Sequence, residues 1–242
     1  MNILAIIQAR GGSKSIPKKN IKLLAGKPMI AWTIEEAKRS KLLTRVIVST
    51  DDEEIAQIAK QHGAEVPFMR PAEFAQDLST SLDVNLHALE WLEKNENYVP
   101  DVVVMLPPTA PLRTAEDIDK AVEILLKSPD ADSVKPLIEA AKHPYKALKV
   151  DGEFVEPFFS KEITGHDEPY DLPRQLFPKS YVYSGALQAM WRKTLTEKKS
   201  LTGRKAKYFL MKPDDCINID SPAEFELAEI LLRRRLEGNS GF

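Results

Sequence analysis

The residue types with the clearest chemistry lie near the start of the chain, in the stretch 8–20, which reads Gln-Ala-Arg-Gly-Gly-Ser-Lys-Ser-Ile-Pro-Lys-Lys-Asn. Two glycines, Gly11 and Gly12, allow the backbone to turn sharply and to approach a ligand closely. The cations around them are Arg10, Lys14, Lys18 and Lys19. Turned amide groups and positive side chains both attract anionic oxygens. The stretch therefore predicts a loop that holds a polyphosphate.

This prediction does not rest on a standard phosphate motif. The stretch has neither the G-x-x-x-x-G-K-[ST] pattern of Walker loops nor the G-x-G-x-x-G pattern of dinucleotide-binding folds. A surface turn with solvated lysines is the alternative interpretation. The apolar run 3–7, which predicts a buried strand just before the loop, favours a ligand site.

Strand and helix patterns alternate along most of the chain. Apolar or β-branched runs predict strands at 3–7, 46–49, 65–70, 101–106, 133–134, 181–190 and 207–211. Helical patterns cover 28–40, a segment through Ala59 that follows a capping box at Thr50–Glu53, a segment from about 79–81 to Leu92, 115–127 and 222–236. Alternating strands and helices with short links indicate an α/β fold, a doubly wound and mostly parallel sheet of the Rossmann-like type.

Ligands of such sheets bind beyond the carboxyl ends of the strands. This rule places the loops 8–20, 70–81 and 107–113 at one site. The alternation of strand and helix patterns stops over 137–180, a stretch that is rich in proline and aromatic residues. We interpret this stretch as a β-rich arm with a role in dimerisation, inserted in a single domain that spans 1–242.

Composition narrows the class of protein. The chain has 242 residues, 34 basic and 36 acidic side chains and a formal net charge of −2, which gives no support for a nucleic-acid partner. A single cysteine, Cys216, rules out an intrachain disulfide and a cysteine zinc cluster. No apolar run approaches membrane-spanning length, and Met1-Asn2 leads directly into the first strand. We expect a soluble, cytoplasmic protein with no membrane partner.

A series of short motifs resembles the acylneuraminate cytidylyltransferases, which make CMP-sialic acid and related CMP-nonulosonates. The matching motifs follow the order found in that family and span nearly the whole chain. They are Ala9-Arg10 with Ser13-Lys14, Pro17-x-Lys19-Asn20, Val48-Ser49-Thr50-Asp51, Arg70-Pro71-Ala72-Glu73, Asp77 with Ser81, Pro108-Thr109-Ala110-Pro111-Leu112-Arg113, His143-Pro144-x-Lys146, Arg174-Gln175 and Ile219-Asp220-Ser221-Pro222.

The resemblance implies that CTP and a 2-keto-3-deoxy sugar acid react, with Mg²⁺, to give a CMP-sugar and pyrophosphate. Phosphoryl-group chemistry of this kind depends on positioning and charge stabilisation. The residues that the resemblance assigns to the nucleotide are Ala9, Arg10, Gly11, Gly12, Ser13, Lys14, Lys19, Asn20, Arg70 and Ser81. Those that it assigns to catalysis are Arg10, Lys14, Lys19 and Asp220. For Arg70, a surface cation at a loop start is the alternative.

The expected metal ligand is Asp220, with Asn218 at the partner position. The family has two carboxylates spaced by one residue, and alternation along an extended strand points both the same way. An amide oxygen can still coordinate Mg²⁺ but brings no charge. The alternative role for Asp220 is the N-cap of the following helix.

The positions that contact the sugar in the family differ more from the family pattern than the nucleotide positions do. Pro107 replaces a glutamine that contacts the sugar, and Val182 and Ser184 replace an arginine and an asparagine. The resemblance places Thr109, Lys146 and Arg174 at the acceptor, the last two reaching into the partner subunit of a homodimer. The alternative for these two cations is pairing with the local acids Glu153, Glu156, Asp167 or Asp171.

These departures predict CTP chemistry with an altered acceptor, an anionic sugar acid. Three alternatives stay open: transfer to 3-deoxy-octulosonate, transfer to a phosphonate or another anionic alcohol, and a catalytically silent nucleotide-binding homologue in which Asn218 marks a decayed metal site. Retention of Arg10, Lys14 and Lys19 speaks against the silent homologue.

Overall fold

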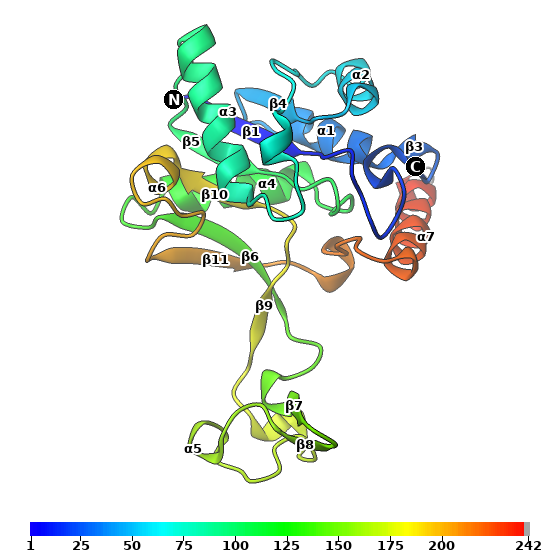
Figure 1. The fold of residues 1–242 in the computed structure, drawn as a ribbon, viewed down its shortest axis with the longest axis vertical. Helices are drawn as coiled ribbons and strands as arrows, with labels where there is room; N and C mark the ends of the chain where they lie inside the picture. Colours follow the sequence, from blue (N-terminus) through cyan, green and yellow to red (C-terminus); the bar gives the residue numbers. More distant parts are fainter. Residues whose placement is uncertain (240–242) are drawn as a thin grey trace. The chain divides into compact units, whose positions relative to one another are not determined.

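A computed structural model gives the structure of the chain, and it describes residues 1–239. Its main element is a seven-stranded sheet with the order β11–β6–β10–β5–β1–β4, in which β9 pairs with β6 (Figure 1). The strands of this sheet are β1 (Ile3–Gln8), β4 (Arg45–Ser49), β5 (Val102–Met105), β6 (Ser133–Glu139), β9 (Tyr181–Tyr183), β10 (Gln188–Trp191) and β11 (Ala206–Leu210).

The side of the sheet that contains β5, β1 and β4 is parallel. β1 pairs in parallel with both β4 and β5, whereas β10 runs antiparallel to β5 and β6. β1 and β5 are buried almost throughout, which explains their near-continuous apolar sequences. The predicted α/β fold with a mostly parallel sheet is confirmed. The strand predicted at 181–190 is divided into β9 and β10, because Gly185 between them has a positive φ of 74°.

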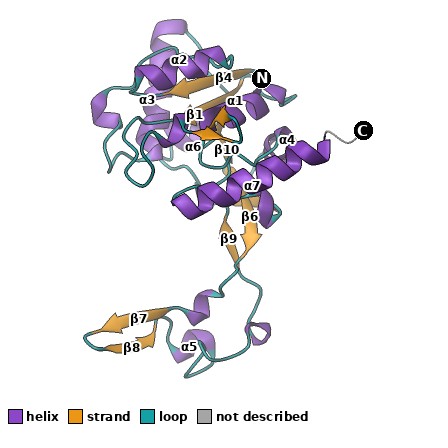
Figure 2. Ribbon diagram, turned by 90° about the vertical axis from the view of Figure 1, so that its right-hand side faces the viewer, coloured by secondary structure: helices purple, strands orange, loops and turns teal. Residues whose placement is uncertain are grey.

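Helices cover the sheet (Figure 2). They are α1 (Met29–Arg39), α2 (Glu53–Gln61), α3 (Ser81–Glu96), α4 (Ala115–Leu126) and α6 (Arg192–Thr196). A further helix, α7 (Pro222–Asn239), packs beside Leu24 and Trp32 in a separate apolar cluster. Leu4 and Ile6 of β1 pack in one apolar cluster with residues of α3 and α6. The alternate residues Ala5 and Ile7 are fully buried and point to the opposite face. α1 contacts β1, β4, α2 and α4, so both faces of the sheet carry helices.

Two local predictions were wrong. Residues 65–70 form no strand and make only two isolated bridges, Ile47 with Glu65 and Thr50 with Met69. Pro67 explains the interruption, because proline has no N–H to donate to a ladder. The cap of α2 is Asp52, whose carboxylate accepts a hydrogen bond from the amide of Ile55, and Thr50 is not the capping residue.

Residues Leu137–Tyr183 form a second compact unit, and the rest of the chain forms the first. Within this second unit, β7 (Leu148–Asp151) and β8 (Phe154–Pro157) form an antiparallel hairpin beside the short helix α5 (Lys161–Thr164) (Figure 2). The rings of His143, Tyr145 and Phe177 pack together, with centroids 4.8–5.5 Å apart. This unit includes the stretch 137–180, over which the alternation of strands and helices stops in the sequence.

Asp132 fastens the loop after α6 to the start of β6. Its buried carboxylate pairs with Lys198 and accepts hydrogen bonds from the amides of Arg204 (2.7 Å) and Lys205 (3.1 Å). The hydrogen bond from Lys198, followed by those from the two amides, lowers the pKa of Asp132 to about 2.

We expect Asp132→Asn to lower the free energy of unfolding at pH 7. Because the folded-state pKa lies below the unfolded value, the stabilisation is present above the unfolded pKa of 3.8 and is lost as the pH falls towards about 2. Urea unfolding of both proteins at pH 7 and near pH 2.5 measures this. The deficit of the variant should shrink at low pH, and an equal deficit at both pH values would contradict the assignment.

Candidate active site

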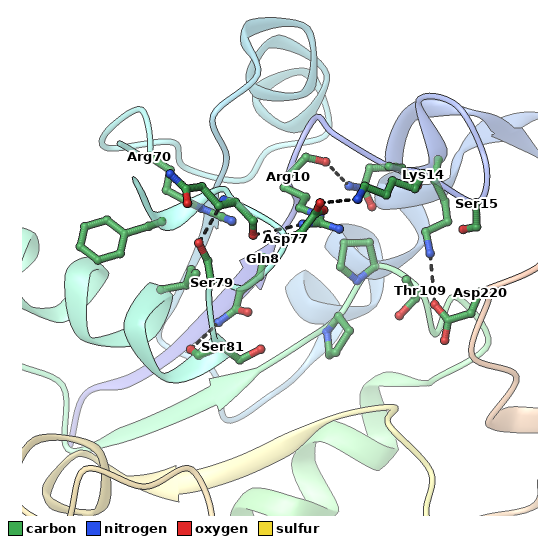
Figure 3. A pocket seen from close by; sticks show the side chains of 18 residues that line it. Gln8, Arg10, Lys14, Ser15, Arg70, Asp77, Ser79, Ser81, Thr109 and Asp220 are labelled. Carbon is green, nitrogen blue, oxygen red and sulfur yellow. Dashed lines mark hydrogen bonds and ion pairs between the residues drawn. The ribbon is translucent and has the colours of Figure 1, made fainter. Parts of the chain in front are cut away.

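A cavity of about 470 Å³ lies at the carboxyl ends of the central strands (Figure 3). The loops after β1 and β5 and the segment that precedes α3 all contribute to its walls. The residues that the sequence assigned to a site and that line this cavity are Arg10, Ser13, Lys14, Lys19, Asn20, Arg70, Ser81, Pro107, Thr109 and Asp220. Cationic and hydroxyl side chains dominate this set, so the cavity suits a polar, anionic ligand.

The glycine loop lies against Asp51 and Asp52, which follow strand β4. The amide of Gly11 donates to Asp51 Oδ1 at 3.0 Å, and a Cβ at Gly11 would lie 2.8 Å from Asp52 Oδ2. Gly12 has nothing within 4 Å of such a Cβ, and neither glycine lines the cavity, nor does the buried Ala9. The close approach at Gly11 is therefore to the side chain of Asp52, which leaves no room for a larger residue at this position.

Lys19 joins three segments of the chain. Its side chain is only 12% exposed, and its Nζ donates to the carbonyl of Ile219 at 2.7 Å and lies 3.2 Å from Asp220 Oδ1. The amide of Ile219 in turn donates to the carbonyl of Thr109 at 2.8 Å. Lys19 thus joins the glycine loop to the segment around Asp220, and the amide of Ile219 joins that segment to the loop that follows β5.

The neighbouring Lys18 lies outside the cavity. Its backbone adopts a left-handed conformation with φ 51°, and its Nζ pairs with Glu54 at 2.5 Å. Asn20 is buried, and its amide donates to the carbonyl of Arg10 at 2.9 Å. Asn20 therefore positions the first cation of the loop as well as lining the cavity.

Arg10 and Lys14 meet a carboxylate across the cavity. Arg10 Nη1 lies 3.1 Å from Asp77 Oδ1, and Lys14 pairs with the other oxygen of Asp77 (Figure 3). Arg10 also donates to the carbonyl of Gln76 at 3.2 Å. These contacts lower the pKa of Asp77, with the hydrogen bond from Lys14 as the largest cause. Asp77 is therefore ionised at neutral pH.

Arg70 is buried, so its interpretation as a surface cation was wrong. It is 6% exposed, its Nε donates to Ser49 Oγ at 3.0 Å, and its Nη2 donates to the carbonyl of the same serine. Burial lowers the pKa of Arg70 to about 10, so the side chain stays protonated at neutral pH. Its guanidinium is held in one orientation at the cavity wall.

Gln8 is a lining residue to which the sequence assigned no role. It ends β1, and its Nε2 donates to the carbonyl of Ser81, at the start of α3, at 3.2 Å. A polar side chain that closes an apolar strand just before the glycine loop was the signal that could have identified it.

The loop after β5 is anchored by a buried cation. Arg113 is 1% exposed, and its Nη1 donates to the carbonyls of Pro107 (3.3 Å) and Ala186. Pro107 and Thr109 therefore have fixed places in the cavity wall. Ser184 is buried and lies outside the lining of this cavity; its Oγ accepts a 3.3 Å hydrogen bond from the amide of Ala186.

The carboxylate of Asp220 does not cap α7. Ser221 and Glu224 form the helix start, because Glu224 Oε2 accepts from the amides of Asp220 (2.9 Å) and Ser221 (2.8 Å), and Ser221 Oγ accepts from the amide of Glu224 (3.3 Å). The Asp220 side chain is 66% exposed, and its oxygens face Lys19 Nζ and Asn218 Nδ2, the latter at 2.6 Å. The capping alternative is therefore not the role of this carboxylate.

Lys146 and Arg174 belong to the second unit. Lys146 Nζ donates to the carbonyl of Tyr170 at 3.2 Å, and Arg174 lines a cavity of about 310 Å³ formed by that unit. The acids Glu156 and Asp167 pair with other lysines, and no ion pair within residues 1–239 involves Lys146 or Arg174. The alternative of local ion pairs therefore has no support in the structure.

Comparisons with known proteins identify the family of the chain. The sequence model of the cytidylyltransferase family matches residues 4–229. The chain is 34% identical to the CMP-N,N'-diacetyllegionaminic acid synthase of Legionella pneumophila over 241 residues, 98% of this chain and 99% of that protein. It is 33% identical to the post-translational flagellin modification protein B of Campylobacter coli, over 96% of each chain.

A solved structure of CMP:2-keto-3-deoxy-manno-octonic acid synthetase complexed with CTP has the same fold, with a TM-score of 0.69 at 19% sequence identity. The superposition covers 97% of this chain and 100% of that one. The family match covers far more than half of the sequence, and the fold agrees with it. The chain therefore belongs to the cytidylyltransferase family.

Proposed function

We propose that this cytidylyltransferase transfers CMP from CTP to the anomeric hydroxyl of a 2-keto-3-deoxy sugar acid of the sialic-acid-like nonulosonate type. The observation that carries the proposal is the cavity in which Arg10, Lys14 and Lys19 converge opposite the loop of Pro107 and Thr109. Relatives that act on nonulosonates support the acceptor class: their names specify diacetyllegionaminic acid, pseudaminic acid and N-acylneuraminate.

In this reaction the acceptor oxygen forms a bond to the α-phosphorus of CTP. The bond between the α-phosphorus and the oxygen that bridges the α- and β-phosphates breaks, so that pyrophosphate leaves. The proton of the acceptor hydroxyl passes to solvent. Arg10 and Lys14 would bind the phosphates, and Lys19 would stabilise the negative charge that develops on them. Arg70, Asn20 and Ser81 would hold the nucleoside end of CTP.

Mg²⁺ is the cofactor we propose. Within residues 1–239 no group of three or more His, Cys, Asp and Glu side chains could hold a metal ion by itself. Asp220 nevertheless offers an exposed carboxylate at the cavity, and Asn218 beside it carries an amide oxygen. Mg²⁺ commonly takes one or two carboxylates and fills its shell with water and substrate phosphates. Asp220 fits an ion that the triphosphate would share, and Asn218, whose Nδ2 donates to Asp220 at 2.6 Å, would offer its oxygen once its side-chain amide is turned over.

We propose that the protein acts as a homodimer in the cytoplasm, where CTP is available. The β7–β8 hairpin exposes several apolar side chains: Val150 and Phe154 are each 77% exposed, and Val155 is 63% exposed. Monomeric proteins rarely expose large apolar patches, so this hairpin supports contact with a second copy. No helix in the described part of the chain is long and apolar enough to cross a membrane. Lys146 and Arg174 would then bind the acceptor carboxylate in the partner's site, as the resemblance implies.

Phe154→Glu is expected to convert the dimer to a monomer, because a charge at this exposed apolar position cannot be buried against a second copy. Light scattering after size-exclusion chromatography measures the mass. Val99→Glu, which introduces the same charge at an exposed valine outside the arm, is the matched control and should stay dimeric. A Phe154→Glu protein that keeps the mass of the unsubstituted protein would contradict the role of the hairpin.

Pyrophosphate release from CTP and Mg²⁺ across a panel of acceptors tests the proposed function. The panel contains sialic, legionaminic and pseudaminic acids, deaminated nonulosonate, octulosonate and a simple phosphonate. We expect release with at least one nonulosonate and not with the last two acceptors. Release with only octulosonate or the phosphonate would overturn the acceptor class. If no acceptor gives pyrophosphate release although the protein binds CTP, the result would favour a catalytically silent nucleotide-binding homologue.

A further inference from the structure

Asp77 occupies the place where the proposed function puts phosphate oxygens. Its two carboxylate oxygens face the two cations of the glycine loop, Arg10 and Lys14, and it lines the same cavity (Figure 3). The carbonyl of Gln76, one residue earlier, accepts a second hydrogen bond from Arg10 Nη1 at 3.2 Å. The carboxylate of Asp77 and the carbonyl of Gln76 thus accept from the donors of Arg10 and Lys14 that would otherwise bind a triphosphate.

We propose that Asp77 is a specificity-determining residue: an internal counter-ion that a polyphosphate must displace from Arg10 and Lys14. The inference rests on the proposed function, because it takes these two cations as the phosphate-binding groups. A ligand with several phosphate charges can replace the single carboxylate at both cations. A ligand with one phosphate group, such as inorganic phosphate, displaces it poorly. Asp77 therefore favours triphosphates and, by returning to its cations, promotes release of pyrophosphate.

A ligand can readily displace Asp77 from its ion pairs with Arg10 and Lys14, because these pairs are exposed to water. The side chains of Lys14 and Asp77 are 79% and 49% exposed, and exposed ion pairs are weak because water screens them. Arg10, at 36% side-chain exposure, stays anchored at the cavity when the carboxylate leaves, since Asn20 holds its backbone carbonyl. Displacement of Asp77 therefore requires little rearrangement of the cations.

The loop that carries Asp77 keeps its shape through hydrogen bonds among its own residues. Ser79 Oγ donates to the carbonyl of Glu73 at 2.9 Å and accepts from the amide of Gln76 at 3.0 Å, so the turn is closed by its own hydrogen bonds. Leu78 at the tip is 92% exposed and makes no apolar anchor. Contacts of Arg10 and Lys14 with this turn are what fix Asp77 at the cavity.

Titration calorimetry with CTP and with pyrophosphate tests the inference on the full-length protein. Asp77→Asn keeps the size of the side chain and removes its charge, and we expect it to bind both ligands about tenfold more tightly and inorganic phosphate, titrated in the same way, by a larger factor. Its affinity should also fall more steeply with added salt, because two cations lose their internal partner. Asp77→Glu, which keeps the carboxylate, should stay close to the unsubstituted protein.

The matched control is Asp130→Asn, which removes the same charge from an exposed aspartate whose nearest cation, on Lys205, is 3.8 Å away. It should leave both affinities unchanged. Equal or weaker binding by Asp77→Asn, in a protein that still converts CTP to a CMP-sugar, would overturn the inference alone. Failure of every form to bind CTP and pyrophosphate would overturn the proposed function and this inference together.

Discussion

Lys19→Met is expected to lower kcat/KM for CMP transfer about 10²–10³-fold, the usual cost of removing one fixed donor of charge stabilisation from an active site. The Nζ of Lys19 is largely enclosed and holds both the carbonyl of Ile219 and the carboxylate of Asp220. Methionine keeps the length and apolar character of the side chain but loses the charge. The measurement is the rate of pyrophosphate release at varied CTP concentration.

Lys18→Met is the matched control, since it removes the same charge from the adjacent residue, whose Nζ pairs with Glu54 outside the cavity. It should retain activity within about threefold of the unsubstituted protein, as surface substitutions usually do. Equal activity of the Lys18 and Lys19 variants would show that the cavity does not carry the reaction. Thermal unfolding of both variants separates lost chemistry from lost folding.

Asp220→Asn should reduce the rate at least about a hundredfold and raise the Mg²⁺ concentration needed for half-maximal activity, because Asp220 supplies the only charge of the proposed metal site. Asn218→Asp is the complementary change. A second carboxylate beside Asp220 should lower the half-maximal Mg²⁺ concentration. Rates measured over a Mg²⁺ titration give both quantities.

The control for this pair is Asp214→Asn, an exposed aspartate earlier in the same segment, which should titrate like the unsubstituted protein. An Asp220→Asn protein that keeps full activity at every Mg²⁺ concentration would rule out Asp220 as the ligand. A large gain in the saturated rate of Asn218→Asp would instead indicate that Asn218 marks a decayed site.

The sequence predicted most of the fold, because burial imposes simple patterns. Strand β5 is buried along its whole length, and its run of valines is visible directly. The first strand, the helix from 115 and the last helix were predicted within a few residues at most boundaries. The errors came from single residues whose effect depends on context. Pro67 removed a ladder donor, and Asp52 capped α2 in place of Thr50.

The candidate site was less accessible to sequence reasoning. Lys19 and Asp220 are 201 residues apart, and only the family resemblance joined them before the structure did. Lys18 and Lys19 have the same chemistry, and a left-handed backbone at Lys18 decides which one reaches the cavity. Asp77 was visible as part of a motif, yet its pairing with Arg10 and Lys14 depends on how two loops face each other. No spacing rule contains that information.

The most direct test of the proposed reaction follows the phosphorus atoms of CTP. The enzyme is incubated with Mg²⁺, a nonulosonate acceptor and CTP labelled at either the α- or the γ-phosphate. Attack at the α-phosphorus predicts that the α-label moves to the sugar acid and that the γ-label leaves in pyrophosphate, with both transfers slowed about 10²–10³-fold in Lys19→Met. Transfer of the γ-label to the acceptor, or no transfer of the α-label to any sugar acid while CTP is bound, would contradict the reaction proposed for this cavity.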